Sequence, residues 1–375
     1  MIHRRLEQTV RKALLRDKAI LIMGARQVGK STLLKQMFSG DATALWLNGD
    51  EADVQMAFER ASSTSLRALI GNKKLLILDE AQRISDIGLK LKLIIDNVAG
   101  VKVIATGSSS FDLSNKVNEP LTGRKLEYKM FPLSFGEMVA HTHLLEEKRM
   151  LHHRLVYGYY PGVVNEPGHE RENLVNLTSS YLYKDILALD KLQKPDRLLK
   201  LLQCIAMQVG SQVSNHELSL QVGLDTKTVE RYIDLLEKCY VVFSLNSFSR
   251  NLRNELKKSR KIYFFDNGVR NAVIGNFSPV ESRMPAEAGA LWENFLVAER
   301  MKKNAYDLAY CNTWFWRTKS QQEIDYLEVA DGKINAFEFK WNVKKHPAPP
   351  AAFVASYPGS GYQVISPLNV EEFLL

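Results

Sequence analysis

A glycine-rich stretch that ends in lysine and serine carries the clearest chemistry in this sequence. Residues 24–31 read Gly-Ala-Arg-Gln-Val-Gly-Lys-Ser, which fits the spacing G-x-x-x-x-G-K-[ST] in full. Glycines let a backbone curl closely around phosphates, so that successive N–H groups point at the anion. The lysine reaches the β- and γ-phosphates, and the serine hydroxyl binds Mg²⁺. The stretch therefore predicts a site for a nucleoside triphosphate and its magnesium ion.

The segments on both sides of this loop indicate how it is positioned. Ala19–Met23 is a continuous apolar run, typical of a strand buried on both faces of a parallel sheet. A helical pattern resumes at residues 30–38, so the positive end of a helix also faces the phosphates. The alternative is a chance glycine turn, but the order strand, loop, helix argues against it. The residues assigned to the nucleotide are Gly24, Ala25, Arg26, Gln27, Val28, Gly29, Lys30, Ser31 and Thr32.

An acidic pair follows another apolar strand. Leu75–Leu78 is entirely apolar, and Asp79 and Glu80 come directly after it. We expect Asp79 to bind Mg²⁺ together with Ser31, and Glu80 to act as the general base toward the attacking water. The alternative is that both acids only cap the following helix. The phosphate loop earlier in the chain argues against that alternative.

Two more residues complete the predicted nucleotide site. Ser108 follows a strand over residues 101–106, and a polar side chain there contacts the γ-phosphate or the water. We favour Ser108 over Thr106, and a simple turn is the alternative. Arg124 is a candidate arginine finger that steadies transition-state charge, within the chain or across a subunit boundary. A surface or ion-paired arginine is an equally good interpretation. Gln82 is a weaker candidate for facing the nucleotide.

Three acids and a lysine toward the C-terminus form a second candidate site. Glu293 lies in a helical segment, Asp325 in a strand, and Glu338 and Lys340 in the strand after the Asp331–Gly332 turn. In such a hairpin Asp325 lies beside Glu338, and alternation places Glu338 and Lys340 on one face. Glu293, Asp325 and Glu338 would bind Mg²⁺, while Glu338 and Lys340 would act in phosphodiester hydrolysis. Charges on an exposed strand face, or a nuclease fold without activity, are the alternatives.

The elements between these sites indicate a helical region with a helix-turn-helix. Helical patterns cover residues 171–190 and 196–209, and a short helix at 215–222 is followed by Gly223 and a helix at 226–238. Strands at 240–245 and 261–265 would form a wing around the basic Arg250–Arg260 stretch. The residues expected to meet DNA are Thr226, Lys227, Thr228 and Arg231. The alternative is a winged helix used only for protein packing.

Length and composition limit the class of protein. The 375 residues suggest several domains, and the formal net charge of +8 suits a polyanionic partner such as DNA. The three cysteines match no zinc spacing and fit a cytoplasmic location, and no apolar run is long enough to span a membrane. We expect an ATPase domain at residues 1–145, a helical connector at 146–195, a winged-helix domain at 196–268 and a last domain at 269–375.

Taken together, these motifs resemble a family of prokaryotic AAA-type ATPases related to the STAND branch. Its members carry an ATPase domain, a winged helix and a C-terminal restriction-endonuclease-like, PD-(D/E)XK domain. The motifs that carry the likeness are Gly24–Thr32, Leu78–Gln82, Thr106–Ser109, Leu121–Arg124, Pro132–Phe135, Tyr160–Gly162, Lys184–Ile186 and the C-terminal Glu293, Asp325 and Glu338–Lys340. The resemblance implies ATP as the nucleotide and self-association, in a ring or another oligomer.

The expected fold class is α/β: a P-loop NTPase parallel sheet, then a helical and winged-helix region, then an α+β restriction-endonuclease-like domain. One departure from the family concerns Pro347, Pro349 and Pro350, which stand where such nucleases continue with a supporting helix. Residues 361–366 are expected to supply a last strand.

The leading hypothesis is a Mg-ATP-hydrolysing protein that binds DNA and cleaves its phosphodiester bonds. One alternative is an ATP-regulated switch or scaffold without nuclease chemistry. Another is a DNA translocase or branch-migration motor whose nuclease fold only grips DNA.

Overall fold

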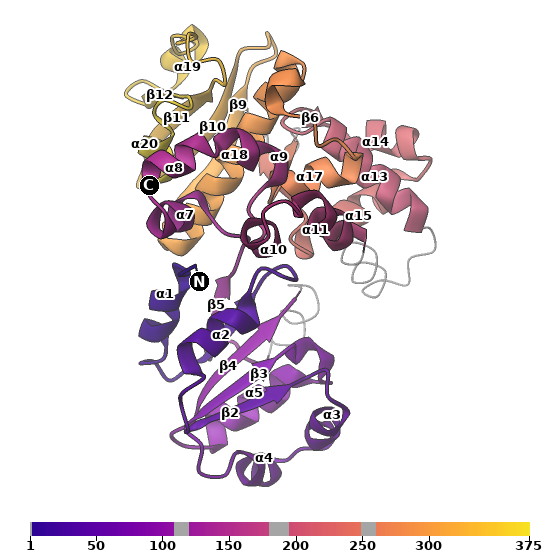
Figure 1. The fold of residues 1–375 in the computed structure, drawn as a ribbon, viewed down its shortest axis with the longest axis vertical. Coiled ribbons are helices and arrows are strands. Elements are labelled where there is room, and N and C mark those ends of the chain that lie inside the picture. The colour runs from indigo at the N-terminus through magenta and orange to yellow at the C-terminus, as the bar shows by residue number, and fades with distance from the viewer. Residues whose placement is uncertain (1, 109–119, 180–194, 249–259) are drawn as a thin grey trace. The chain divides into compact units, whose positions relative to one another are not determined.

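The computed structural model describes residues 2–108, 120–179, 195–248 and 260–375 (Figure 1). These residues form two compact units. The first comprises Met1–Pro132 with Lys238–Tyr240, and the second comprises Leu133–Glu237 with Val241–Leu375. The domain boundaries predicted at residues 145, 195 and 268 stay predictions. The Arg250–Arg260 stretch up to residue 259 and the Lys184–Ile186 motif lie outside the described residues.

In the described part of the first unit, five strands form one parallel sheet in the order β2-β3-β4-β1-β5. The strands are β1 (Ala19–Met23), β2 (Ala44–Asn48), β3 (Leu75–Asp79), β4 (Lys102–Gly107) and β5 (Lys125–Lys129). The strands β1, β3 and β4 lie within a residue of their predicted positions. The alternating polar sequence of β5 hid it from sequence analysis, because β5 lies at the edge and is only partly buried.

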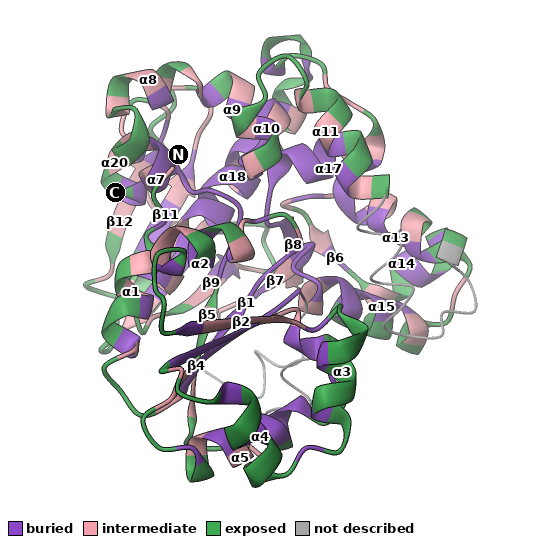
Figure 2. Cartoon of the chain, turned by 60° about the horizontal axis from the view of Figure 1, so that its bottom comes forward, coloured by how far each residue is buried: buried purple, intermediate pink, exposed green. Residues whose placement is uncertain are grey.

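Helices cover this sheet because the central strands are apolar on both faces. All five residues of β1 are buried, and Figure 2 shows β1 and β4 in purple beside the exposed green faces of α3 and α4. The helices of the unit are α1 (Leu6–Ala13), α2 (Lys30–Phe38), α3 (Ala52–Glu59), α4 (Ser63–Ile70), the 3₁₀ turn η1 (Ala81–Arg83) and α5 (Ile87–Asn97). The predicted parallel α/β sheet is therefore confirmed.

The second unit begins with short helices. They are α7 (Phe135–His141), α8 (Leu144–Arg149), α9 (Leu151–Tyr157), α10 (Pro161–Asn165) and α11 (Glu170–Leu177). The capping box of Ser134 and Glu137 starts α7, with the side chain of each residue bonded to the backbone N–H of the other. Further along follow α13 (Pro195–Met207) and α17 (Asn267–Ile274), which contact each other.

A helix-turn-helix and a small sheet lie next in the chain. The helix α14 (Asn215–Val222) ends at Gly223, whose φ of 68° is left-handed, and α15 (Thr226–Lys238) follows. In the described residues, β6 (Gln212–Val213), β7 (Val242–Asn246) and β8 (Arg260–Phe264) form an antiparallel sheet in the order β6-β8-β7. The buried side of α15 includes Val229, Tyr232, Ile233 and Leu236.

The C-terminal part holds a mixed sheet of four strands among the described residues, in the order β12-β11-β10-β9. The strands are β9 (Asn312–Arg317), β10 (Glu323–Ala330), β11 (Lys333–Phe339) and β12 (Gly361–Ile365). The helices are α18 (Pro285–Tyr306), α19 (Ala351–Ser356) and α20 (Val370–Leu374), with the 3₁₀ turn η3 (Val280–Ser282) before them. The last strand expected at residues 361–366 is present.

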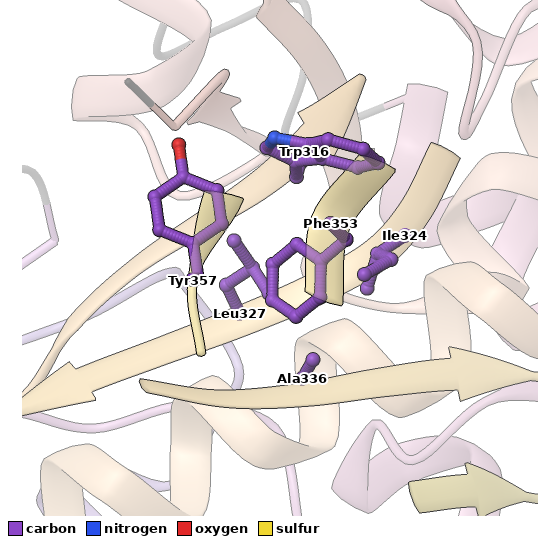
Figure 3. Packing of buried hydrophobic residues seen from close by; sticks show 6 residues of the cluster. All are labelled: Trp316, Ile324, Leu327, Ala336, Phe353 and Tyr357. Carbon is purple, nitrogen blue, oxygen red and sulfur yellow. The ribbon is translucent and has the colours of Figure 1, made fainter. Parts of the chain in front are cut away.

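Apolar packing fixes α19 on this sheet. Phe353 of α19 and Tyr357 just after it pack against Trp316, Ile324, Leu327 and Ala336, as Figure 3 shows. A short helix thus follows the proline-rich segment at 347–350, where the sequence had put a supporting helix in doubt. Aromatic and aliphatic side chains together form this core. No described helix combines the length and apolar character needed to cross a lipid bilayer.

Candidate functional site

The loop between β1 and α2 begins at a position that only glycine fits. A Cβ at Gly24 would lie 2.0 Å from the carbonyl oxygen of Met130, so a larger residue does not fit there. Gln27 and Gly29 have φ values of 60° and 96°, and Gly29 precedes the first turn of α2. The loop therefore curls before a helix N-terminus, which is the geometry that cradles phosphate.

The Lys30 ammonium lies inside the curl of this loop. Its Nζ donates hydrogen bonds of 2.8 Å each to the carbonyl oxygens of Gly24 and Ala25, and the residue is 5% exposed. A buried cation at the centre of a backbone cradle attracts an anion. The loop thus has both the charge and the backbone shape that the sequence predicts.

Sequence analysis missed Arg4, which ties the loop to the end of the sheet. Its Nη1 donates to the carbonyl of Val28 at 2.6 Å, and its Nη2 donates to the carbonyl of Phe131 at 2.7 Å. Arg4 is only 7% exposed. No local motif marks this residue, because its partners lie 24 and 127 positions away along the chain.

The acidic pair is anchored to the neighbouring strand β4. The Thr106 hydroxyl donates to Oδ1 of Asp79 and accepts a 3.1 Å hydrogen bond from the backbone N–H of Glu80. The next residue of β4, Gly107, accepts a hydrogen bond of 3.3 Å from the N–H of Gly24. Consecutive residues of one strand therefore hold the acids and the start of the phosphate loop together.

Gln82 connects the predicted general base to Ser108. Its Nε2 donates to Oε2 of Glu80 at 2.5 Å and to Oγ of Ser108 at 3.0 Å. Gln82 and Ser108 are both 6% exposed. The weak sequence signal at Gln82 thus marks a residue in contact with the predicted base, while the roles of Glu80 and Ser108 in catalysis stay predictions.

Arg124 lies at the other end of the sheet from the loop. Its carbonyl accepts from the N–H of Ala19, the first residue of β1, whereas the loop follows Met23, about 13 Å further along the strand. Its Nε donates to Oδ1 of Asp96 at 2.7 Å, an ion pair that is partly exposed. Arg124 therefore does not reach the phosphate loop of its own chain, and action in a neighbouring subunit stays a prediction.

These residues fit the Mg-ATP that the sequence implies. The donor set joins backbone N–H groups, a buried ammonium, a serine hydroxyl and an aspartate, which together suit phosphate oxygens and a hard cation. Ser31 is the first residue after Lys30 in α2, and Asp79 ends β3. Both remain the predicted magnesium ligands.

The second candidate site lies in a pocket of about 800 Å³ in the second unit. Glu293 of α18, Asp325 of β10 and Lys340 all line this pocket. The register that pairs Tyr326 with Phe337 places Asp325 beside Glu338, as the sequence predicts. The structure thus brings the four predicted residues to one region.

Each of these carboxylates already has a partner within the chain. Glu338 accepts a 2.5 Å hydrogen bond from the Lys340 ammonium, and Asp325 accepts one of 2.8 Å from the N–H of Phe339. Glu293 accepts from Lys261 Nζ at 2.8 Å and from the Tyr263 hydroxyl at 2.6 Å. Lys261 also pairs with Glu323 at 2.5 Å. Sequence analysis gave no role to Lys261, Tyr263 or Glu323, because their contacts cross from β8 to the C-terminal elements.

Crowded charge perturbs the proton affinities of this cluster. Burial, followed by the negative charges of Glu293 and Glu338, raises the pKa of Asp325 well above its ordinary value. Burial also raises the pKa of Glu338, although Lys340 opposes the shift. The carboxylates therefore repel one another, and the nearby ammonium groups offset that repulsion.

A divalent metal ion does not fit this arrangement of side chains. Across the described ranges, no three His, Cys, Asp or Glu side chains are grouped to hold a metal ion. The carboxylates point at ammonium, hydroxyl and N–H donors instead. The metal-binding roles of Glu293, Asp325 and Glu338 stay predictions that require a rearrangement.

The helix α15 presents the side chains expected to meet DNA. Thr226, Lys227 and Arg231 are exposed, and Thr228 is half-buried because Asp225 accepts hydrogen bonds from its N–H and hydroxyl groups. Asp225 thus caps the helix.

Comparison with known families divides the chain into three parts. Residues 16–139 match an AAA domain, residues 148–280 match a domain of unknown function (DUF8612), and residues 288–371 match another domain of unknown function (DUF4143). The first match covers the loop, the acidic pair and Arg124. The other two cover the helix-turn-helix and the carboxylate pocket.

Relatives in two organisms, and one solved structure of similar fold, cover most of the chain. An uncharacterised protein of Mycobacterium tuberculosis is 25% identical over 88% of this chain and 72% of its own length. One from Methanocaldococcus jannaschii is 23% identical over 85% of this chain and 74% of its own. The solved structure of a Walker-type ATPase of Pyrococcus abyssi has a TM-score of 0.50 at 16% identity, covering 73% of this chain and 96% of that one. The AAA match and the shared fold support a P-loop ATPase of the AAA type.

Proposed function

We propose that this chain hydrolyses ATP with Mg²⁺ and couples hydrolysis to an action on DNA. The observation that carries the ATPase proposal is the shared anchoring on β4, where Gly107 holds the loop at Gly24 and Thr106 holds Glu80. Lys30, already buried in the loop, neutralises phosphate charge. Ser31 and Asp79 would hold Mg²⁺, which would polarise the phosphoryl oxygens, and Glu80 would accept the proton of the attacking water.

Two substitutions test the ATPase proposal. Lys30→Ala should abolish tight binding of ATP, because it removes the ammonium from the cradle. Glu80→Gln should retain nucleotide binding and lower kcat by about a hundredfold or more, because it removes a general base without changing the shape of the side chain. Binding is measured with a fluorescent ATP analogue and turnover by phosphate release. Unchanged turnover in Glu80→Gln would show that another group is the base.

DNA is the partner that the helix-turn-helix and the charge favour. The order α13, β6, α14, α15, β7, β8 and the antiparallel sheet of these strands support the proposal of a winged helix. Lys227 and Arg231 are exposed on the second helix of the turn. A net charge of +8 adds a general attraction to phosphates. If no DNA is bound at low salt, the alternative of an ATP-regulated switch or scaffold gains support.

Phosphodiester cleavage at the carboxylate pocket is a second candidate function. The pocket that contains Glu293, Asp325 and Lys340 favours it. The test is Mg²⁺- or Mn²⁺-dependent cutting of linear, single-stranded and branched DNA, with Glu338→Ala and Lys340→Ala as controls. Cutting that both substitutions remove supports a nuclease. ATP turnover that DNA stimulates without cutting supports a translocase or branch-migration motor.

Self-association would give Arg124 a role. Because Arg124 lies at the far end of its own sheet, a contribution to ATP hydrolysis requires a second subunit, in a ring or another oligomer. Mixing Arg124→Ala with Lys30→Ala protein tests this, since each variant keeps what the other lacks. Partial recovery of ATP turnover in the mixture supports action across a subunit boundary, and no recovery argues against it.

A further inference from the structure

The carboxylate centre of the second unit contains a buried ammonium from another element. Lys261 belongs to β8 of the small sheet, is 1% exposed, and lies 2.8 Å from Glu293 and 2.5 Å from Glu323. Asp325 also acts on it electrostatically. One cation is therefore shared by acids of α18 and β10, in the manner of a metal ion held by carboxylates.

Further donors also contact these acids. The Tyr263 hydroxyl shares Oε1 of Glu293 with Lys261, and Nη1 of Arg317 lies 3.2 Å from Oε2 of Glu323. Burial lowers the pKa of Lys261, but Glu293, Asp325 and Glu323 outweigh it and raise that pKa above its ordinary value. The Lys261 ammonium thus lies between two carboxylates, those of Glu293 and Glu323.

Strand pairing on both sides holds the backbone of Lys261 in place. Lys261 pairs with Gln212 of β6 and Leu245 of β7, so its strand is held on both sides. Its Nζ also lies 5.4 Å from the centre of the Phe315 ring on β9. The strand pairing thus fixes the backbone of Lys261, and the ring and the acids hold its ammonium.

We propose that Lys261 is the resident cation of this centre, and that its ammonium takes the place among Glu293, Glu323 and Asp325 that a divalent metal ion would need. This inference bears on the cleavage proposal but does not rest on it, because metal binding is measured without DNA or ATP.

The test is a Mn²⁺ titration of chelator-treated, nucleotide-free protein, followed by calorimetry and electron paramagnetic resonance. Lys261→Met keeps the length of the side chain but removes its charge, so it should bind Mn²⁺ at least about tenfold more tightly than the unaltered protein. Adding Asp325→Asn to Lys261→Met should remove the gain, which places the ion at this centre rather than at the phosphate loop.

Lys302→Met is the matched control. Lys302 is also fully buried, but its ammonium pairs with one acid, Glu299, at 2.6 Å. It should gain no affinity for Mn²⁺. If Lys261→Met does not fold in metal-free buffer, Mn²⁺ should restore its circular dichroism spectrum but not that of an unfolded Lys302→Met.

Three results would overturn the proposal. One is equal Mn²⁺ affinity of the unaltered protein and Lys261→Met at a site that Asp325→Asn abolishes, since the two cations would then coexist. Another is a folded Lys261→Met that gains no affinity. The last is an unfolded Lys261→Met that Mn²⁺ does not restore.

Discussion

Lys30 and Arg4 show two ways in which a buried cation serves the phosphate loop. Lys30 donates to the loop from inside, to Gly24 and Ala25, and is placed to exchange these carbonyls for phosphate oxygens. Arg4 donates from outside, to the carbonyl of Val28, and also reaches Phe131. Its planar guanidinium suits such a double contact, which a lysine does not reproduce. Arg4 therefore fixes the shape of the cradle without touching its contents.

Arg4→Ala should weaken ATP binding by about tenfold. Without the Arg4 hydrogen bonds the free loop is less ordered, so binding ATP costs more conformational entropy. Arg4→Lys should recover only part of the affinity. Equilibrium binding of a fluorescent ATP analogue measures the effect, and the exposed neighbour Arg5 supplies the control variant Arg5→Ala. Equal affinities of Arg4→Ala and Arg5→Ala would show that the loop holds its shape unaided.

Sequence alone finds residues whose function depends on local spacing. Gly24 and Lys30 were found because one short loop contains both the turn and the charge. Arg4 and Lys261 were not found, since the contacts of both depend on elements far apart in the chain. Of the four C-terminal residues, the hairpin pair Asp325 and Glu338 follows from strand alternation, whereas the ammonium between Glu293 and Glu323 follows only from tertiary packing.

At the scale of elements, the helix-turn-helix contains a partly buried carboxylate, that of Glu237 on α15. Burial raises the pKa of Glu237 on α15, and Asp234 adds to the shift, while the hydroxyl of Ser244 on β7 and the charge of Arg260 oppose it. A raised pKa in the folded state means that the contribution of Glu237 to stability is fully present below the unfolded pKa. That contribution is lost as pH rises through the folded pKa.

Glu237→Gln should therefore raise Tm by about 1–2 °C near neutral pH, since glutamine still accepts from Ser244 and carries no charge. The gain should vanish below about pH 4, where the carboxyl group is protonated in both states. Calorimetry at several pH values measures this. Glu230→Gln, at an exposed position of the same helix, is the control and should change Tm little. A gain for Glu237→Gln that persists at acidic pH would contradict the linkage argument.

The β10–β11 hairpin depends on its turn, which sets the register of Asp325 against Glu338. Asp331 and Gly332 have φ values of 50° and 76°, the conformation of a two-residue turn with both central residues left-handed. Gly332→Ala should lower the free energy of unfolding by about 1 kcal/mol, because alanine is strained at positive φ. Urea unfolding measures the loss. Gly289→Ala, in α18 with open space around its Cα, should have the opposite sign.

Element patterns were easiest to predict where the burial was continuous or strictly periodic. The apolar β1 and the amphipathic α15 were predicted at their observed bounds. The edge strand β5 was missed, because one exposed side leaves it no apolar pattern. The short α19 was also missed, since it is held by Phe353 against the sheet rather than by its own propensity.

At the scale of the whole molecule, the formal charge of +8 implies attraction to any polyanion. A test of DNA binding must therefore distinguish contacts made by α15 from attraction by the net charge. Lys227 and Arg231 lie on the exposed side of α15, which a winged helix places against DNA. Lys12 and Arg16, in or just after α1, are also exposed and carry the same total charge. Substituting either pair with alanine therefore removes the same charge, from α15 in one case and from the region of α1 in the other.

Lys227→Ala/Arg231→Ala should weaken binding to duplex DNA and reduce the slope of log K against log salt by about two, roughly one for each lost phosphate contact. Lys12→Ala/Arg16→Ala should leave that slope nearly unchanged, although it lowers the net charge equally. Fluorescence anisotropy with a labelled duplex, over a series of NaCl concentrations, measures both. Equal effects of the two pairs would mean that the surplus charge, and not α15, draws DNA to the protein, and the helix-turn-helix would then be a packing module.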